Sequence, residues 1–402
     1  MKTFSIVLLL FVINIGIKAQ WQQINSGLPE LSIYGLTSDG EYLYSGTSAN
    51  GVYRSSNKGN SWISVNNGLP NSNAWELFSN NDTIFAGFFG PGAFRSTDYG
   101  NTWDTLIVGQ VNSSVRSFIS LNNFLFAATW GNGVFRSSDG GDNWTQINNG
   151  LNHQTFWDIF AYEDTLLAAG PSAGVYRSTD NGNSWTQSIS GLTDIIAYRI
   201  CSLNNYIFVG TGYSGVFRSS DFGKSWTQVG VNGQGIYAFL SYDSWIFAGT
   251  INAGVFVSSD YGNTWEEFNN GNVAGSVVEL ISDSAYIYAA SLGGGVYRYD
   301  VNNISSVYSS DLEAPALFEL KQNYPNPFNP NTVISYQLPV SGDVTLKVYD
   351  VLGNEVATLA DEYKPAGSYE VEFSADDLTS GIYFYKLQAG SFSETKKMIL
   401  IR

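Results

Sequence analysis

The chain has 402 residues, of which 44% are hydrophobic, 15% aromatic and only 13% charged, and it contains 42 Gly. This length exceeds one ordinary domain, and the composition favours many short strands joined by tight turns over helices. The net charge of −16 argues against nucleic-acid binding, while one Cys (Cys201) and one His (His153) exclude an intramolecular disulfide and a zinc site of His and Cys.

The first segment has the features of a secretory signal peptide. Lys2 precedes an apolar run that ends at Ile17, and the small residue Ala19 precedes Gln20. We expect cleavage after Ala19, which gives a signal peptide at residues 1–19. The alternative is a transmembrane anchor, but the apolar run is shorter than the roughly 20 residues that a membrane-spanning helix needs.

A repeat of 41 residues follows. Six segments with the pattern Ser-x-Asp/Asn-x-Gly-x-x-Trp begin at residues 55, 96, 137, 178, 219 and 258, each directly after a predicted strand, and only the first has Asn in place of Asp. A seventh such strand opens at Gly295 without a following Trp, whereas Trp21 lies 41 residues before Trp62. The sequence therefore predicts an all-β fold at residues 20–304: a seven-bladed β-propeller whose last blade is completed by the N-terminal strand.

Two other repeat architectures fit this sequence less well. An open β-solenoid needs no completion of its last unit by the N-terminus. The WD40 repeat pairs Trp directly with Asp, whereas here Asp precedes Trp by five positions. Both features favour a closed propeller of another type, and closure also removes exposed strand edges.

The repeated segment predicts a hairpin turn between the third and fourth strands of each unit. Its acidic residue can accept backbone N–H bonds, its Gly allows positive φ, and its Trp can bury a large ring. These segments resemble the Asp-box (BNR, sortilin-like) repeat across residues 21–300. That family includes sialidases, glucan-cleaving glycosidases, sortilin-type receptors and photosystem II assembly factors. The resemblance implies a structural role for Asn57, Asp98, Asp139, Asp180, Asp221, Asp260, Trp62, Trp103, Trp144, Trp185, Trp226 and Trp265.

The period ends after Asp300, and we expect a linker at residues 305–322. Residues 323–402 open with Asn-Tyr-Pro-Asn-Pro-Phe-Asn-Pro and continue in alternating stretches that predict a small Ig-like β-sandwich. The opening, residues 348–353, residues 378–385 and residues 396–400 resemble the type A C-terminal sorting domain of the type IX (Por) secretion system.

This second resemblance implies a Gram-negative bacterium of the Bacteroidetes or an allied group. It also implies export through the periplasm to the medium or the outer cell surface, with the secretion machinery as a partner of residues 323–402. The alternative is an ordinary accessory sandwich.

The starts of the first strands predict a site, because these strands line a propeller's channel. They align as one column of Tyr34, Trp75, Arg116, Trp157, Tyr198, Tyr237 and Val278, and a second column of Gly35, Glu76, Ser117, Asp158, Arg199, Ala238 and Glu279. Trp130 and Phe89 lie in loops expected on the same face. The ligand-binding candidates are Tyr34, Trp75, Arg116, Trp130, Trp157, Tyr198, Arg199 and Tyr237.

Aromatic faces with a few polar groups suit the pyranose rings of a polysaccharide, whereas the alternative is that these rings only pack between blades. Sialidase activity needs three clustered Arg, and only Arg116 and Arg199 lie outside the outer-strand repeat positions. Glu76, Asp158 and Glu279 are weak candidates for an acid–base pair in glycoside hydrolysis. His153 lies in a polar loop and is expected to be solvated.

We therefore expect a secreted or cell-surface binder of polysaccharide or protein, without catalysis, metal or cofactor. The alternatives are a glycoside hydrolase that acts on an extracellular glycan and a scaffold for envelope assembly or adhesion.

Overall fold

The computed structural model describes residues 20–70, 72–110, 113–269, 273–304, 317–339, 342–364, 367–376, 378–390 and 392–401. The chain divides into two compact units, residues 1–303 and 304–402. The expected signal peptide and residues 305–316 of the expected linker lie outside the described residues. Within the described residues, no helix is long and apolar enough to cross a membrane.

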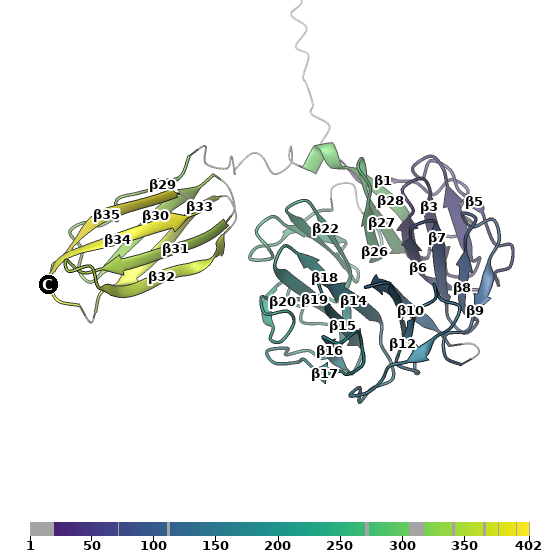
Figure 1. Ribbon diagram of the computed structural model, residues 1–402. Coiled ribbons are helices and arrows are strands. Elements are labelled where there is room, and N and C mark those ends of the chain that lie inside the picture. The colour runs from purple at the N-terminus through teal and green to yellow at the C-terminus, as the bar shows by residue number, and fades with distance from the viewer. Residues whose placement is uncertain are drawn as a thin grey trace, which may run out of the picture. The chain divides into compact units, whose positions relative to one another are not determined.

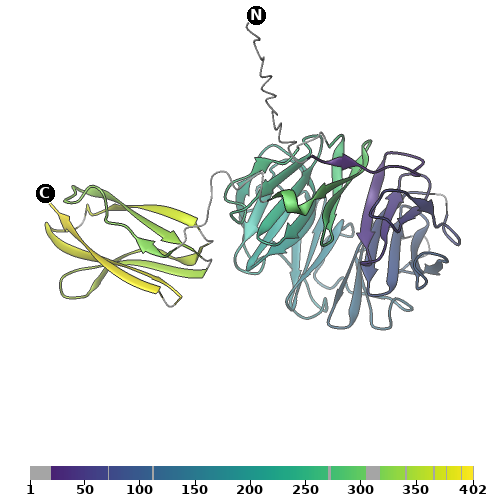
Figure 2. The same cartoon turned by 90° about the horizontal axis from the view of Figure 1, so that it is seen from above.

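The first unit consists of seven four-stranded antiparallel sheets, the blades of a β-propeller, arranged around a central channel (Figures 1 and 2). Blades 1 to 3 comprise β2 (Ile33–Ser38), β3 (Leu43–Thr47), β4 (Val52–Ser55) and β5 (Ile63–Ser64); β6 (Ala74–Asn80), β7 (Thr83–Phe88), β8 (Gly92–Ser96) and β9 (Asp104–Leu106); and β10 (Val115–Leu121), β11 (Phe124–Thr129), β12 (Val134–Ser137) and β13 (Thr145–Gln146).

The later blades repeat this order. Blades 4 to 6 comprise β14 (Asp158–Tyr162), β15 (Thr165–Gly170), β16 (Gly174–Ser178) and β17 (Thr186–Gln187); β18 (Ala197–Leu203), β19 (Tyr206–Thr211), β20 (Val216–Ser219) and β21 (Thr227–Gly230); and β22 (Ile236–Tyr242), β23 (Trp245–Thr250), β24 (Val255–Ser258) and β25 (Glu266–Glu267). Blade 7 comprises β26 (Ser276–Ser282), β27 (Tyr286–Leu292), β28 (Gly295–Asp300) and the N-terminal strand β1 (Gln22–Gln23). A 3₁₀ turn, η1 (Val301–Asn303), follows.

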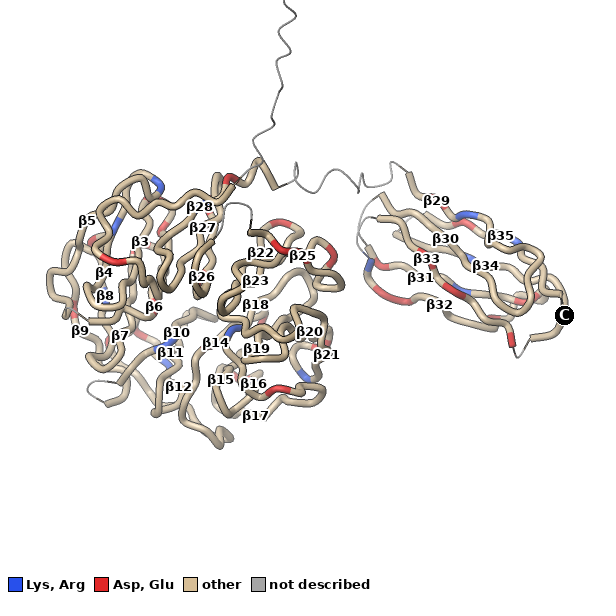
Figure 3. The backbone as a smooth tube through the Cα atoms, turned by 180° about the vertical axis from the view of Figure 1, so that it is seen from behind, with Lys and Arg blue, Asp and Glu red and all other residues tan. Residues whose placement is uncertain are grey.

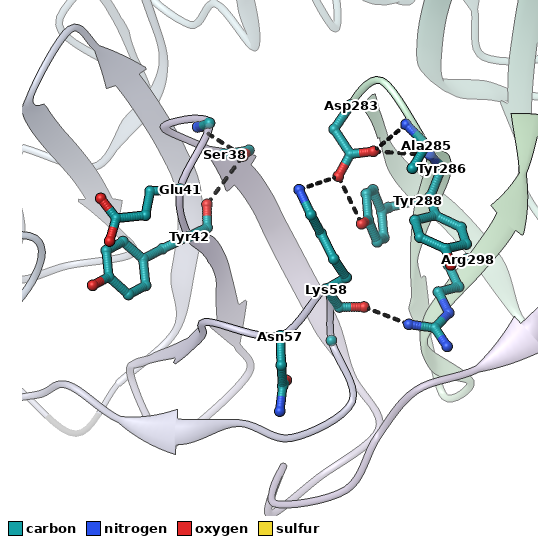
Figure 4. Close-up of polar contacts among 12 residues, drawn as sticks. Ser38, Glu41, Tyr42, Asn57, Lys58, Asp283, Ala285, Tyr286, Tyr288 and Arg298 are labelled. Carbon is teal, nitrogen blue, oxygen red and sulfur yellow. Dashed lines mark hydrogen bonds and ion pairs between the residues drawn. The ribbon is translucent and has the colours of Figure 1, made fainter.

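The N-terminal strand closes the ring, which confirms the predicted propeller. Strand β1 pairs antiparallel with β28, with Gln22 opposite Arg298. Trp21 is buried, and its Nε1 donates to the carbonyl oxygen of Phe268 in blade 6 at 2.7 Å. On the other side of the junction, Lys58 Nζ in blade 1 lies 2.9 Å from Asp283 Oδ2 in blade 7 (Figure 4). The N-terminal segment is therefore tied to blades 6 and 7, and an ion pair joins blade 7 to blade 1.

The second strand of each blade is buried on both faces, because the neighbouring blades pack against it. Every residue of β3 is buried, as are five of the six residues of β11. Small side chains let the blades approach closely: a Cβ at Gly87 would lie 2.5 Å from the carbonyl oxygen of Val115 in the next blade. Burial on both faces is the reason that these strands read as nearly continuous apolar runs.

Each Asp-box hairpin is held by its own side chains. Ser96 Oγ donates to Asp98 Oδ1 at 2.8 Å, and the same carboxylate oxygen accepts the N–H of Thr102 at 2.8 Å. Trp103 Nε1 donates to the carbonyl oxygen of Val65 in the preceding blade at 2.8 Å. The same Ser and backbone N–H contacts recur at Asn57, Asp139, Asp180, Asp221 and Asp260. Four box rings are buried (Trp62, Trp103, Trp185, Trp226), and Trp144 and Trp265 are half-buried.

The second unit is a two-sheet β-sandwich. One sheet has the order β29 (Glu319–Leu320), β30 (Asn331–Leu338), β33 (Gly367–Ser374), and the other β32 (Glu355–Lys364), β31 (Gly342–Tyr349), β34 (Gly381–Ala389), β35 (Phe392–Leu400). Alternate residues of the strands face one core that includes Ile334, Leu346 and Tyr385. Period-2 burial is the pattern expected of antiparallel strands with one buried face.

Candidate functional site

The eight predicted ligand-binding residues line one cavity at the mouth of the propeller channel. Its volume is about 240 Å³, and its walls are Tyr34, Trp75, Arg116, Trp130, Trp157, Tyr198, Arg199 and Tyr237, together with Val278 and Leu292 of blade 7. Their position at one cavity is a structural fact, and ligand binding by them stays a prediction. Phe89, in the loop after β7, contacts the rim through Trp75, at a ring-centroid distance of 4.7 Å.

A β-bulge at the start of the first strand in six of the seven blades aims these side chains into the mouth, whereas β14 of blade 4 pairs with β15 without a register shift. In blade 3, the pairing of β10 with β11 shifts register between Val115 and Ser117, so that Arg116 is the extra residue. The same shift occurs at Tyr34, Trp75, Tyr198, Tyr237 and Val278. Consecutive residues of a regular strand point to opposite faces, and a bulge removes that restriction locally. The bulges therefore let two successive columns of residues face the channel.

The aromatic rings form a continuous arc from blade 1 to blade 6. Centroid distances are 5.6 Å from Tyr34 to Trp75 and 6.0 Å from Trp130 to Trp157. Trp157 stacks on Tyr198 at 4.3 Å with an interplanar angle of 2°. Trp130 is 44% exposed, so part of the arc is accessible from solvent.

Arg116 occupies the wall of this cavity as a stacked cation. Its guanidinium carbon lies 3.7 Å from the centroid of the Trp75 ring and 6.0 Å from that of Trp157. Burial and repulsion from Arg199 lower the pKa of Arg116 to about 9. Among the described residues, its Nε has no hydrogen-bond partner, and neither do Trp75 Nε1 and Trp157 Nε1. The cavity wall therefore contains several N–H donors without acceptors.

A ring of charged groups lies in the channel below the aromatic arc. Arg199 Nη2 lies 3.3 Å from Glu279 Oε2, and its Nη1 donates to the carbonyl oxygen of Trp157 at 3.2 Å. Although burial disfavours its charge, Glu279, Asp158 and Glu76 together raise the pKa of Arg199. Arg199 thus has an ion-pair partner in Glu279, and no ion pair of Arg116 is found among the described residues.

Burial raises the pKa of both glutamates of this ring. The pKa of Glu76 rises to about 8, because Glu279 and Asp158 add repulsion to the effect of burial and outweigh the opposing attraction of Arg199. Burial likewise raises the pKa of Glu279 against the opposing attraction of Arg199. At neutral pH the ring therefore carries fewer negative charges than its composition indicates.

Asp158 joins blades together. Its Oδ1 accepts from Ser117 Oγ in blade 3 at 2.9 Å, and its Oδ2 accepts the N–H of Ile200 in blade 5 at 2.7 Å. Neither Asp158 nor Glu76 nor Glu279 lines the cavity. Within the described ranges, these acids also form no group of three or more side chains that could hold a metal ion.

Sequence alignment of the blades did not single out two residues of this face. Leu292, at the end of β27, lines the cavity, and Tyr213, in the loop after β19, is 72% exposed. Both follow the second strand of their blades, as Trp130 and Phe89 do, so that aligning this loop in all blades could have found them. His153 is half-buried and does not line the cavity.

Family models match two parts of the chain. The secretion system C-terminal sorting domain matches residues 322–401, and the BNR-Asp box repeat matches residues 216–229. A comparison with curated protein sequences gives no match. The chain is therefore an Asp-box propeller followed by a secretion system sorting domain. This domain indicates export by the type IX system to the cell surface or the medium.

Solved structures with this fold have different functions. PorZ of Porphyromonas gingivalis, a bacterial surface component of the type IX secretion system, is 14% identical with a TM-score of 0.55, over 94% of this chain and 60% of its own. YCF48 of Cyanidioschyzon merolae is 15% identical with a TM-score of 0.57, over 71% of this chain and 100% of its own. A GH74 xyloglucanase of Xanthomonas campestris is 12% identical with a TM-score of 0.53, and the match covers 91% of this chain and 67% of the xyloglucanase.

Because the chain spans only 60% of PorZ, and all three identities are low, these likenesses show the fold alone. Whether the propeller binds or cleaves its ligand has to be argued from the cavity.

Proposed function

We propose that the propeller is a non-catalytic binder of an extracellular polysaccharide and that the mouth cavity is its site. The observation that carries this proposal is the aromatic arc, to which six blades contribute Tyr34, Trp75, Trp130, Trp157, Tyr198 and Tyr237. Rings that only packed between blades would be covered, whereas Trp130 is 44% exposed.

The chemistry of the cavity suits a carbohydrate. The apolar face of a pyranose packs on an aromatic ring, and its hydroxyl oxygens accept hydrogen bonds. The unpartnered N–H groups of Trp75, Arg116 and Trp157 lie beside those rings. Small movements of these side chains on binding would give each donor an acceptor, which compensates the cost of leaving it unpaired.

Hydrolysis is less well supported than binding. Glu76 has the raised pKa that a general acid needs, which favours the hydrolase as second candidate. However, none of the three acidic candidates lines the cavity, and both oxygens of Asp158 are engaged by neighbouring blades. A glycosidase needs its two carboxyl groups on either side of the scissile bond.

Affinity electrophoresis of the full-length protein through gels that contain a panel of polysaccharides tests this proposal. We expect retardation by at least one polymer and a loss of about tenfold in affinity for Trp130→Ala, because one stacking face is removed. The matched control is Phe222→Ala, since Phe222 is 42% exposed but lies in the β20–β21 hairpin at the opposite end of its blade.

Equal mobility of both variants, or no retardation by any polymer, would contradict the proposal. Release of reducing ends from the retarding polymer would favour the hydrolase instead. Loss of that activity in Glu76→Gln would then identify the acid.

A further inference from the structure

Arg116 differs from every other arginine of the propeller. In the described residues, Arg54, Arg95, Arg136, Arg177, Arg218 and Arg298 each donate to a backbone carbonyl of the next blade, and Arg199 pairs with Glu279. No acceptor of this kind is found for Arg116 within the same residues, where its guanidinium lies over the ring of Trp75. A buried cation without a partner is costly, so its presence on a cavity wall points to an external partner.

The charges around Arg116 favour an anion of single charge. Glu76 attracts its guanidinium and Arg199 repels it, and both interactions act on the pKa of Arg116. A carboxylate carries a single charge opposite to that of the guanidinium and matches its planar fork. The stacking on Trp75 holds that fork in a fixed plane.

The net negative charge of the chain does not keep an anionic ligand away from the cavity, because few acidic residues lie near the cavity mouth. The described loops on this face join the fourth strand of a blade to the next blade and the second strand to the third. They contain no Lys or Arg, and only Glu30 and Asp194 as acids. Asp194 accepts backbone N–H bonds from Ile196 and Tyr213, and Glu30 accepts one from Ala49.

Most other carboxylates of the propeller lie in the turns at the opposite ends of the strands. Figure 3 shows Asp and Glu in red along the backbone. Charges separated by more than a Debye length of about 8 Å are largely screened at physiological salt.

We propose that Arg116 binds the carboxylate of an acidic sugar, so that the polysaccharide recognised at this cavity is a uronic acid polymer. This inference rests on the proposed function and names its substrate class. The sugar ring would stack on the aromatic arc while its carboxylate receives N–H bonds from the guanidinium. Phosphorylated or sulfated glycans and peptide carboxyl termini are the competing ligands.

The test uses the full-length protein and three uronate polymers: polygalacturonate, alginate and hyaluronate. Each is compared with its methyl ester, which has the same backbone without charge. We expect at least one acidic polymer to bind and its ester to bind about tenfold more weakly. Arg116→Met should abolish that difference, and Arg116→Lys should retain part of it, because Lys keeps the charge but loses the planar fork.

The possible outcomes distinguish this inference from the proposed polysaccharide binding on which it rests. Binding of neutral or esterified polymers with no preference for the acid, or an acid preference that survives in Arg116→Met, overturns the role of Arg116 and leaves polysaccharide binding intact. No binding of any polymer overturns both. Stronger binding of dextran sulfate, or of a peptide through its free carboxyl terminus, also overturns the assignment to uronates.

The thermal stability of Arg116→Met serves as a second measurement. Replacing an unpartnered buried cation by an apolar side chain of similar volume removes a desolvation cost, so we expect Arg116→Met to raise the Tm by about 2–5 °C. A lower Tm would show that Arg116 is held by contacts that stabilise the fold, which would contradict its role as a residue kept for a ligand.

Discussion

Glu76 belongs to a buried group of charges whose balance changes near neutral pH. Its pKa is raised from an ordinary value of 4.5 to about 8 by burial, with further repulsion from Glu279 and Asp158 and an opposing effect of Arg199. A carboxyl group with a raised pKa binds its proton more tightly in the folded than in the unfolded protein. The free energy of unfolding therefore decreases as pH rises from 4.5 to about 8.

Replacing Glu76 by Gln should make stability less dependent on pH. We expect the Tm of the unmodified protein to fall between about pH 5 and pH 9, and that of Glu76→Gln to fall several degrees less, because the neutral amide has no proton to lose. Thermal unfolding followed by tyrosine and tryptophan fluorescence measures both. The exposed Glu266→Gln serves as control. If the Tm of Glu76→Gln fell with pH as steeply as that of the unmodified protein, the buried charge of Glu76 would not be the cause of the pH dependence.

At the scale of the element, the Asp-box hairpins link each blade to the previous one. Arg136 of β12 donates to the carbonyl oxygen of Asn181 in the hairpin of blade 4 at 2.7 Å. Arg298 of β28 reaches the carbonyl of Lys58 in blade 1 in the same way, at 2.8 Å (Figure 4). Blade 7 has no Asp-box, since β1 supplies its fourth strand, and the preceding blade carries the buried Val257 at the Arg position. The outer-strand arginines thus occur where a box follows.

The Ser of each box is the residue whose loss should destabilise the hairpin most. Ser137 is buried, and its Oγ accepts the N–H of Gly141 at 2.9 Å while donating to Asp139 Oδ1 at 2.7 Å. We expect Ser137→Ala to reduce the free energy of unfolding by about 1–3 kcal/mol, because it leaves a buried N–H unpaired. Urea unfolding measures this, with the exposed Thr145→Ala as control. A change within 0.5 kcal/mol, which is about that of a surface substitution, would refute it.

At the scale of the whole molecule, stability depends on closure of the ring. Without β1, the outer edge of β28 would expose unpaired backbone groups, and Trp21 would no longer pack against Phe268 and Tyr299 at centroid distances of 5.8 and 5.6 Å. Open strand edges pair with other chains.

Deletion of residues 20–24 should therefore lower the Tm and cause self-association. We expect the shortened protein to elute earlier than the parent in size-exclusion chromatography, because the free edge of β28 pairs between molecules. The control is Gln23→Ala, which removes only the side-chain hydrogen bond to the carbonyl oxygen of Gly294. We expect this variant to elute at the same volume as the parent protein. A shortened protein with unchanged Tm and elution volume would show that β1 is dispensable for closure.

Local sequence was sufficient to predict the propeller, its circular completion and eight of the ten residues that line the mouth cavity. A spacing of 41 residues that shortens to 39 only once keeps equivalent residues at equivalent places, so that Trp75 and Arg116 could be assigned to one face by counting alone. The sorting domain was found in the same way, from its own motifs.

The tertiary structure decided what these side chains can do. Strand alternation by itself would send Arg116 and Ser117 to opposite faces, and only the bulge in the pairing of β10 with β11 brings both to the channel. The sequence also contained two arginines outside the outer-strand repeat positions, Arg116 and Arg199. It could not show that Arg199 pairs with Glu279, or that the Nε of Arg116 has no hydrogen-bond partner among the described residues. Such pairing depends on contacts across blades, which no local pattern encodes.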